Sequence, residues 1–197
     1  MRHQERKLIY KVIAGIFLCF SNYHGSAQEH MDRKPEHKWL RLAEEQYHQG
    51  HYAASLKSAR RFLTIPGRRL VSAASGELEK ARYFQSLAQL QLNVPGAEDT
   101  ATRFLATTAN TAFRQRVSLA LAQYYFRHEK LSQAIPYYEN ANISNLTNAE
   151  IADSKFELAY AYFNSRDFAR AEPLFASIKE VQGKYYLAGN YYYGLLA

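Results

Sequence analysis

Side chains capable of chemistry lie close together at only a few points of the sequence. His48 and His51 are three residues apart, a spacing at which two imidazoles on one helix face can share a metal ion. Gly50 lies between them, so we expect a helix-ending turn that leaves both rings in solvent. The neighbouring carboxylates Glu44 and Glu45 point to different faces of a helix and make a poor acid–base pair. These patterns favour solvated side chains over a metal or catalytic site.

Other signatures of catalysis or cofactor binding are also missing from the sequence. The segment NVPGAED lacks the lysine and the second glycine of a phosphate-binding loop. The only cysteine, Cys19, falls in an N-terminal leader, so the mature chain would have no thiol nucleophile, thiolate metal site or disulfide. We therefore expect no enzymatic activity, no cofactor and no metal ion.

The charge of the chain is too mild and too scattered to predict nucleic-acid binding. The net charge is +7, of which the first 27 residues contribute +3, leaving +4 for the remainder. One local basic cluster consists of Arg60, Arg61, Arg68 and Arg69. A solvated helix end and loop explains this cluster, and contact with an acidic partner or an anionic surface is the alternative.

Residues 1–27 have the pattern of a secretory signal peptide. Basic residues precede an apolar run of nine residues from Val12 to Phe20, and small residues lead up to an expected cleavage after Ala27. Nine apolar residues are too few to span a bilayer stably, which takes about 20. The alternatives are a retained signal anchor and lipid attachment at Cys19, although the latter needs a small residue where Leu18 stands. The pattern predicts export of the protein.

After a polar lead-in at residues 28–35, four segments of the chain align with one another. Each contains a Leu-Ala pair, and successive leucines are 45, 34 and 37 residues apart. The pairs are Leu42-Ala43, Leu87-Ala88, Leu121-Ala122 and Leu158-Ala159. Pro136 and Pro173 also share one register, although a proline inside a helix costs about 3 kcal/mol. The shared proline indicates duplication.

The repeated segments predict an all-α chain of four units and a partial fifth. Small residues, including Ala171, would let helices approach closely, and large aromatic residues would fill the space between units. Gly50 is expected in the left-handed conformation that ends a helix, and Asp167 as a helix N-cap. The expected units are 36–70, 77–110, 111–147, 148–182 and a partial unit 183–197.

These segments resemble the tetratricopeptide repeat (TPR) family over about residues 36–197. The family pattern has a Leu-Gly or Leu-Ala pair, a tyrosine, a turn, a small residue and an aromatic residue. The fourth unit matches it with Leu158, Ala159, Tyr162, Ala171 and Phe175. The third unit matches equally well, the first has Ser55 and Ala59 at the last two positions, and the second is the most degenerate.

The resemblance implies an α-α superhelix, a TPR solenoid of about four and a half helical hairpins. In this family the first helices line a concave groove that binds peptides or helices. Carried over by position, the candidate partner-binding residues are Tyr47, Gln89, Gln123, Phe126, Phe156, Tyr160 and Phe163. Packing of the next hairpin is the other role open to the aromatic residues. Some family members clamp a terminal carboxylate with lysine and asparagine, but Leu40, Glu44 and Ala120 stand at those places here, with Asp153 and Glu157 in the later unit.

The sequence thus predicts an exported scaffold of the bacterial cell envelope, periplasmic or outer-membrane associated, that binds a protein or peptide partner and no nucleic acid. Binding of a saccharide such as peptidoglycan is one alternative, and a non-catalytic N-terminal part of a larger enzyme is another. The last segment, GNYYYGLLA, lacks a polar capping face. We therefore expect that the chain continues in a longer protein, or that another subunit covers this end.

Overall fold

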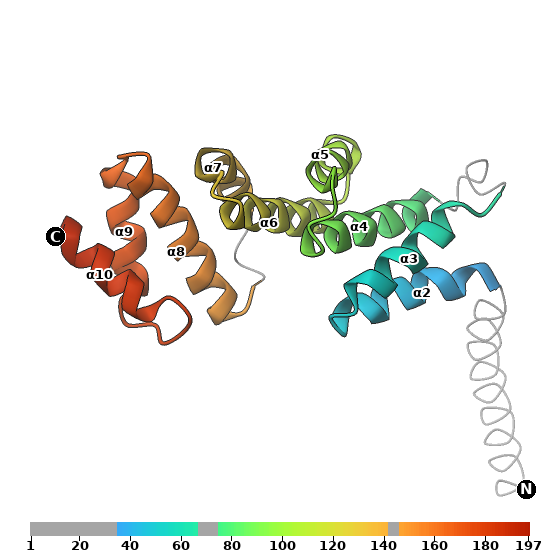
Figure 1. Ribbon diagram of the computed structural model, residues 1–197, viewed down its shortest axis with the longest axis horizontal. Coiled ribbons are helices and arrows are strands. Elements are labelled where there is room, and N and C mark those ends of the chain that lie inside the picture. The colour runs from blue at the N-terminus through green and yellow to red at the C-terminus, as the bar shows by residue number, and fades with distance from the viewer. Residues whose placement is uncertain (1–34, 67–74, 142–145) are drawn as a thin grey trace, which may run out of the picture.

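The computed structural model describes residues 35–66, 75–141 and 146–197. Within these ranges the chain forms nine α-helices and no strand, which confirms the all-α prediction (Figure 1). None of the helices in this part of the chain is long and apolar enough to cross a membrane. The predicted signal peptide, Cys19, Arg68 and Arg69 lie outside the described residues.

The helices form four successive hairpins followed by a single helix. The first helices are α2 (Pro35–His48), α4 (Ser75–Gln91), α6 (Thr111–Arg127) and α8 (Asn148–Asn164), and the single helix is α10 (Tyr186–Leu196). The second helices are α3 (Tyr52–Leu63), α5 (Ala97–Thr107), α7 (Leu131–Asn140) and α9 (Phe168–Ile178). Each second helix contacts its own first helix and the first helix of the next unit.

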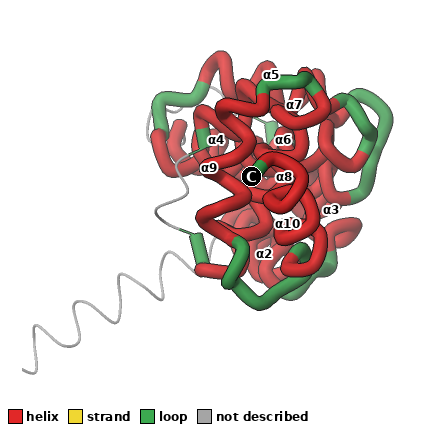
Figure 2. The backbone as a smooth tube through the Cα atoms, turned by 90° about the vertical axis from the view of Figure 1, so that its left-hand side faces the viewer, coloured by secondary structure: helices red, strands yellow, loops and turns green. Residues whose placement is uncertain are grey.

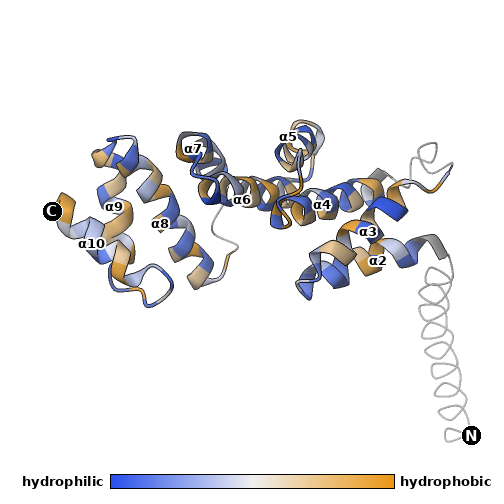
Figure 3. Cartoon of the chain, in the orientation of Figure 1, coloured by the Kyte–Doolittle hydropathy of each residue, from blue (hydrophilic) through white to orange (hydrophobic). Residues whose placement is uncertain are grey.

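The first helices also contact one another in sequence from α2 to α8. The hairpins therefore follow one another in a row from α2 to α10 (Figure 1), and Figure 2 looks along that row from its C-terminal end. Hydrophobic and hydrophilic stretches alternate along the helices (Figure 3). Helices arranged in this way bury their apolar side chains only by stacking on their neighbours, as in helical-repeat proteins.

A residue with a left-handed backbone ends the first helix of every hairpin. These residues are Gly50 (φ 78°), Asn93 (φ 52°), Glu129 (φ 58°) and Arg166 (φ 60°). In all four turns the N–H of the next residue donates to the carbonyl five residues back, at 2.8 to 3.1 Å. This hydrogen bond is typical of the Schellman motif at a helix C-terminus, so the turns of all four hairpins are of the same type. The predicted left-handed conformation of Gly50 is confirmed.

The left-handed turn predicts a stabilising substitution at Arg166. An L-residue in this conformation costs roughly 1–2 kcal/mol, which glycine avoids at a smaller entropic cost. We expect Arg166→Gly to raise the free energy of unfolding by about 1 kcal/mol in urea titrations. Gly50→Ala is the matched reverse change, because an added Cβ there meets nothing within 4 Å. Gly50→Ala should destabilise the protein by a similar amount. If neither substitution changed the urea titration, a left-handed L-residue would cost nothing in these turns.

Small residues lie where the two helices of a hairpin approach each other. The residue seven positions before each left-handed residue is 0% exposed in all four hairpins. These residues are Ala43, Ser86, Ala122 and Ala159. In the first hairpin, Ser55 Oγ donates to the Ala43 carbonyl at 2.6 Å, which joins α2 to α3. The sequence alignment of the second unit, which placed Ala88 at this position, is wrong by two residues, because α4 carries small buried residues at both Ser86 and Ala88.

Large aromatic side chains fill the interior between hairpins, as predicted. Tyr138, Tyr162 and Phe175 are at most 5% exposed, whereas Tyr125 is only half-buried. The two shared prolines both lie inside second helices, α7 and α9. Along the outer side of α10, by contrast, large apolar residues four positions apart are exposed. These are Leu187, Tyr191 and Leu195, at 81%, 63% and 55%.

Side-chain caps fix where α8 and α9 begin. Asp167 Oδ1 accepts a hydrogen bond from the Arg170 N–H at 3.3 Å, which confirms Asp167 as the N-cap of α9. At the start of α8, Thr147 and Glu150 form a reciprocal capping box. The Thr147 backbone N–H donates to Glu150 and is the main reason that the pKa of Glu150 is lowered. These caps therefore fix the first residue of α8 and of α9.

Candidate functional site

Two adjoining cavities run along the first helices, and we call them together the first-helix groove. The larger, of about 720 Å³, lies between α6 and α8 and is bordered by the segment that precedes α10. The smaller, of about 330 Å³, is lined by residues of α2, α4 and α6, by Tyr52 of α3 and by Glu150 of α8. Gln91 and Gln123 line both cavities. The groove therefore follows the first helices of all four hairpins.

The groove presents the same face of α6 and α8. On each helix four of the lining residues are spaced by four, three and four positions, and equivalent residues are 37 apart in the sequence. On α6 these are Arg116, Ala120, Gln123 and Arg127, and on α8 they are Asp153, Glu157, Tyr160 and Asn164. The repeat spacing found in the sequence is therefore also the spacing of the groove residues.

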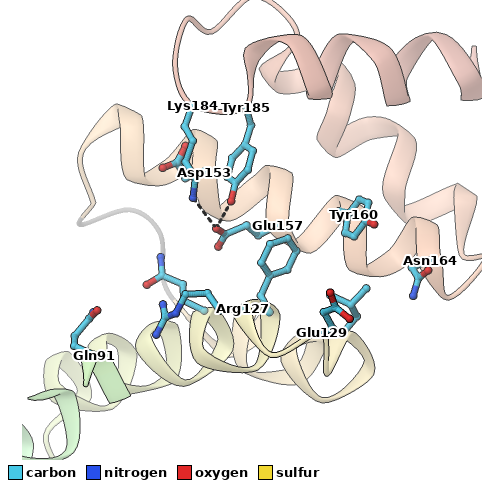
Figure 4. A pocket seen from close by; sticks show the side chains of 12 residues that line it. Gln91, Arg127, Glu129, Asp153, Glu157, Tyr160, Asn164, Lys184 and Tyr185 are labelled. Atoms are coloured by element: carbon cyan, nitrogen blue, oxygen red, sulfur yellow. Dashed lines mark hydrogen bonds and ion pairs between the residues drawn. The ribbon is translucent and has the colours of Figure 1, made fainter. Parts of the chain in front are cut away.

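A buried carboxylate, Glu157, forms the floor of the larger cavity (Figure 4). Its residue is 6% exposed, and its oxygens accept hydrogen bonds from the hydroxyls of Tyr138 at 2.5 Å and Tyr185 at 2.8 Å. The Lys184 Nζ lies 3.9 Å from Glu157 Oε1. Tyr138 belongs to α7, whereas Lys184 and Tyr185 precede α10. The carboxylate thus ties α7, α8 and the connection to α10 together on one side of the groove.

Burial controls the protonation of this network. It raises the pKa of Glu157, and the hydrogen bonds from Tyr138 and Tyr185 oppose that rise only in part. Burial is also the largest cause that raises the pKa of each tyrosine. Both hydroxyls therefore keep their protons and remain donors to Glu157.

The raised pKa predicts how stability depends on pH. In the unfolded chain a glutamate titrates near pH 4.3, so the contribution of Glu157 is complete below about that pH and is lost as pH rises through the higher folded pKa. We expect the free energy of unfolding of the wild type, relative to that of Glu157→Gln, to fall as pH rises through this window. Urea titrations across the window measure the difference. Glu172 is an exposed carboxylate, so Glu172→Gln controls for the loss of one surface charge. Parallel pH profiles of stability for the wild type and Glu157→Gln would refute the expectation.

Several polar side chains of the groove are available to a ligand. Within the described part of the chain, the side chains of Gln123, Asp153 and Asn164 make no hydrogen bond, and Arg127 Nη2 donates only to the Leu90 carbonyl, at 3.2 Å. Amide side chains both donate and accept, a carboxylate accepts and a guanidinium donates. The groove therefore offers donors and acceptors side by side. Among the described residues no three metal-ligating side chains cluster together.

Four of the seven predicted partner-binding residues line the groove, and three do not. The four that line it are Tyr47, Gln123, Phe126 and Tyr160. Gln89 and Phe156 are 6% and 5% exposed and do not line it. Phe163 is half-buried between the rings of Phe168 and Tyr192, at 5.4 and 5.0 Å.

Gln89 and Phe156 are buried outside the groove for different reasons. Gln89 was predicted to line the groove because the second unit was misaligned by two residues. The α4 residues that do line it are Tyr83, Leu87 and Gln91. Phe156 lies about 100° around the helix from Glu157, and its ring stacks on Tyr185 at 4.1 Å within the core.

Sequence reasoning placed Asp153 and Glu157 in the groove only as the residues that stand where a carboxylate clamp would be, and it missed Asn164 on α8 and the pair Lys184 and Tyr185. The repeated polar stripe on α6 and α8 was a signal that could have identified all three α8 residues as candidates for ligand binding. Comparison of the chain with models of known protein families and with curated proteins finds no match. The function is therefore argued from the residues and geometry of the groove.

Proposed function

We propose that this protein is an exported helical-repeat scaffold of the tetratricopeptide type, which binds an extended segment of a protein partner in the first-helix groove. The observation that carries the proposal is the groove itself, which presents equivalent faces of successive first helices with free polar groups on them. Export rests on the signal-peptide pattern of residues 1–27. We further propose that the exported protein acts in the bacterial cell envelope.

The chemistry of the groove suits a peptide main chain. Every peptide group of an extended segment carries an N–H and a C=O that need partners when water is displaced. Gln123 and Asn164 can satisfy both kinds of group, because an amide donates and accepts. The rings of Phe126 and Tyr160 lie edge to face at 5.9 Å and offer an apolar contact for a partner side chain. The Glu157 network holds the cavity wall in place before binding, which lowers the entropic cost.

The same groups favour binding over catalysis. The hydroxyls nearest the buried carboxylate belong to Tyr138 and Tyr185, and both donate to Glu157. Burial raises the pKa of each, so neither is a ready nucleophile.

A saccharide is the second candidate ligand. Asp153 and Asn164 can bind hydroxyl groups, and the half-buried ring of Tyr160 can contact the apolar face of a sugar. Retention of the pure protein on purified cell wall, lost on Gln123→Arg, would favour this ligand over a protein.

A matched pair of glutamine substitutions tests the proposal. Gln123→Arg fills the groove with a bulky cation, whereas Gln133→Arg makes the same change on the exposed side of α7. The wild type and each variant would be used to enrich proteins from an envelope extract of the host. We expect one protein to be enriched by the wild type and by Gln133→Arg but not by Gln123→Arg. Equal enrichment by all three would contradict binding in the groove.

A further inference from the structure

A second recess lies on the outer side of α3 and shares no residue with the first-helix groove. It has a volume of about 360 Å³. Apolar residues form its floor and one edge, and basic residues form the rim. The apolar residues are Ala53, Leu56 and Leu92, and the basic residues are Lys57, Arg60 and Arg61. We call this site the α3 recess.

The basic residues of the α3 recess have no acidic counterpart in the described part of the chain. Helix α3 contains no aspartate or glutamate, and none of its three cations forms an ion pair with a described residue. The guanidinium of Arg61 stacks on the ring of Trp39, 4.5 Å from its centroid. Lys57 and Arg60 are exposed. Two cations are therefore free to meet a negative charge beside an apolar recess.

The later second helices differ from α3 in this respect. Glu98 of α5 pairs with Lys130 at 3.4 Å, and Glu139 of α7 pairs with Arg170 of α9 at 3.0 Å. Cations of the third and fourth units are thus neutralised by the preceding second helix. The favourable effect of cations at a helix C-terminus accounts for Arg60 and Arg61 in the last turn, but not for Lys57 in the middle of α3.

We propose that the α3 recess docks an acidic segment of a protein partner, which inserts an apolar side chain over Leu56 and pairs its carboxylates with Lys57 and Arg60. The recess is near the lower end of the roughly 300–1,000 Å³ range of ligand pockets, so it fits one or two side chains. Carboxylates on both sides of an apolar residue complement its basic rim and apolar floor. This site would let the scaffold hold a second partner while the first-helix groove is occupied.

The shape of the recess favours a protein segment over an anionic membrane. Leu56 is 6% exposed and lies below the basic rim, so the apolar group must project from the partner. A layer of lipid headgroups offers no such projection. Three cations attract an anionic membrane by only about 1 kcal/mol each, which is weak without an inserted apolar group.

Fluorescence anisotropy on the full protein tests the proposal with a set of labelled peptides. Each probe carries leucine, phenylalanine or tryptophan between pairs of glutamates, and matched probes carry glutamine in place of glutamate. The variant Lys57→Glu/Arg60→Glu reverses the two free cations and spares Arg61. The control Arg82→Glu/Arg103→Glu makes the same change of net charge at two exposed arginines that do not line the recess.

We expect an acidic probe to bind the wild type and the control alike, and to bind Lys57→Glu/Arg60→Glu about tenfold more weakly or worse. The glutamine probes should bind none of the proteins, and added salt should weaken the acidic probe. The proposal is overturned if no acidic probe binds below about 1 mM, or if the two double variants bind alike. The proposal is also overturned if vesicles of phosphatidylcholine and phosphatidylserine in equal parts bind the wild type but not Lys57→Glu/Arg60→Glu, while the acidic probes bind neither protein.

Discussion

Replacing Phe175 by alanine is expected to destabilise the protein by about 3–5 kcal/mol, which corresponds to a fall in melting temperature of about 10 °C. Phe175 is 0% exposed, and its ring lies 5.8 Å from that of Phe156 and 5.5 Å from that of Tyr192. These rings belong to α8 and α10, so the substitution opens a cavity where three helices of the last units meet. Thermal and urea unfolding measure the loss.

The matched control for this change is Phe168→Ala on the same helix. Phe168 is 45% exposed, so its removal should cost no more than about 1.5 kcal/mol. Because hairpins contact mainly their neighbours, the Phe175→Ala protein should also show faster amide hydrogen exchange in α8 to α10 than in α2 and α3. Equal destabilisation by the two substitutions would mean that α9 does not pack as described.

Replacing Ala171 by leucine is expected to destabilise the protein by about 1–3 kcal/mol through overpacking. Ala171 is 0% exposed and belongs to the core cluster that joins α8, α9 and α10. Ala169 lies two residues away and is exposed, so Ala169→Leu should change stability by less than about 0.5 kcal/mol. Melting curves of the two variants provide the comparison. If Ala171→Leu melted like the wild type, the assigned register of α9 would be wrong.

The helical class and most of the local signals could be read from the sequence. Spacing of the Leu-Ala pairs predicted helices throughout, and each of the four full units that were expected contains a pair of helices. Asp167 and Gly50 have the predicted cap and turn conformations, because side-chain capping and glycine's left-handed backbone depend on a few neighbouring residues. These predictions needed no knowledge of tertiary contacts.

The rotation of a helix and the placement of loops were harder to predict. In α4, two small buried residues competed for one position, and the choice of Ala88 over Ser86 misplaced Gln89. A left-handed glutamate or arginine at the end of a helix carries no sequence signal comparable to glycine. Lys184 and Tyr185 reach Glu157 from a segment 27 or 28 residues later, and only tertiary packing brings them there.

Photo-crosslinking from Tyr160 tests the central proposal, a protein partner in the first-helix groove, most directly. Tyr160 lines the larger cavity, and is therefore a better site than the partly covered Phe163. A photoreactive amino acid at Tyr160, and as a control at the exposed Glu172 of α9, would be activated in native cells and its adducts identified by mass spectrometry. We predict one defined envelope protein crosslinked from Tyr160 and not from Glu172. Adducts with cell-wall fragments alone, or the same adducts from both positions, would contradict the account.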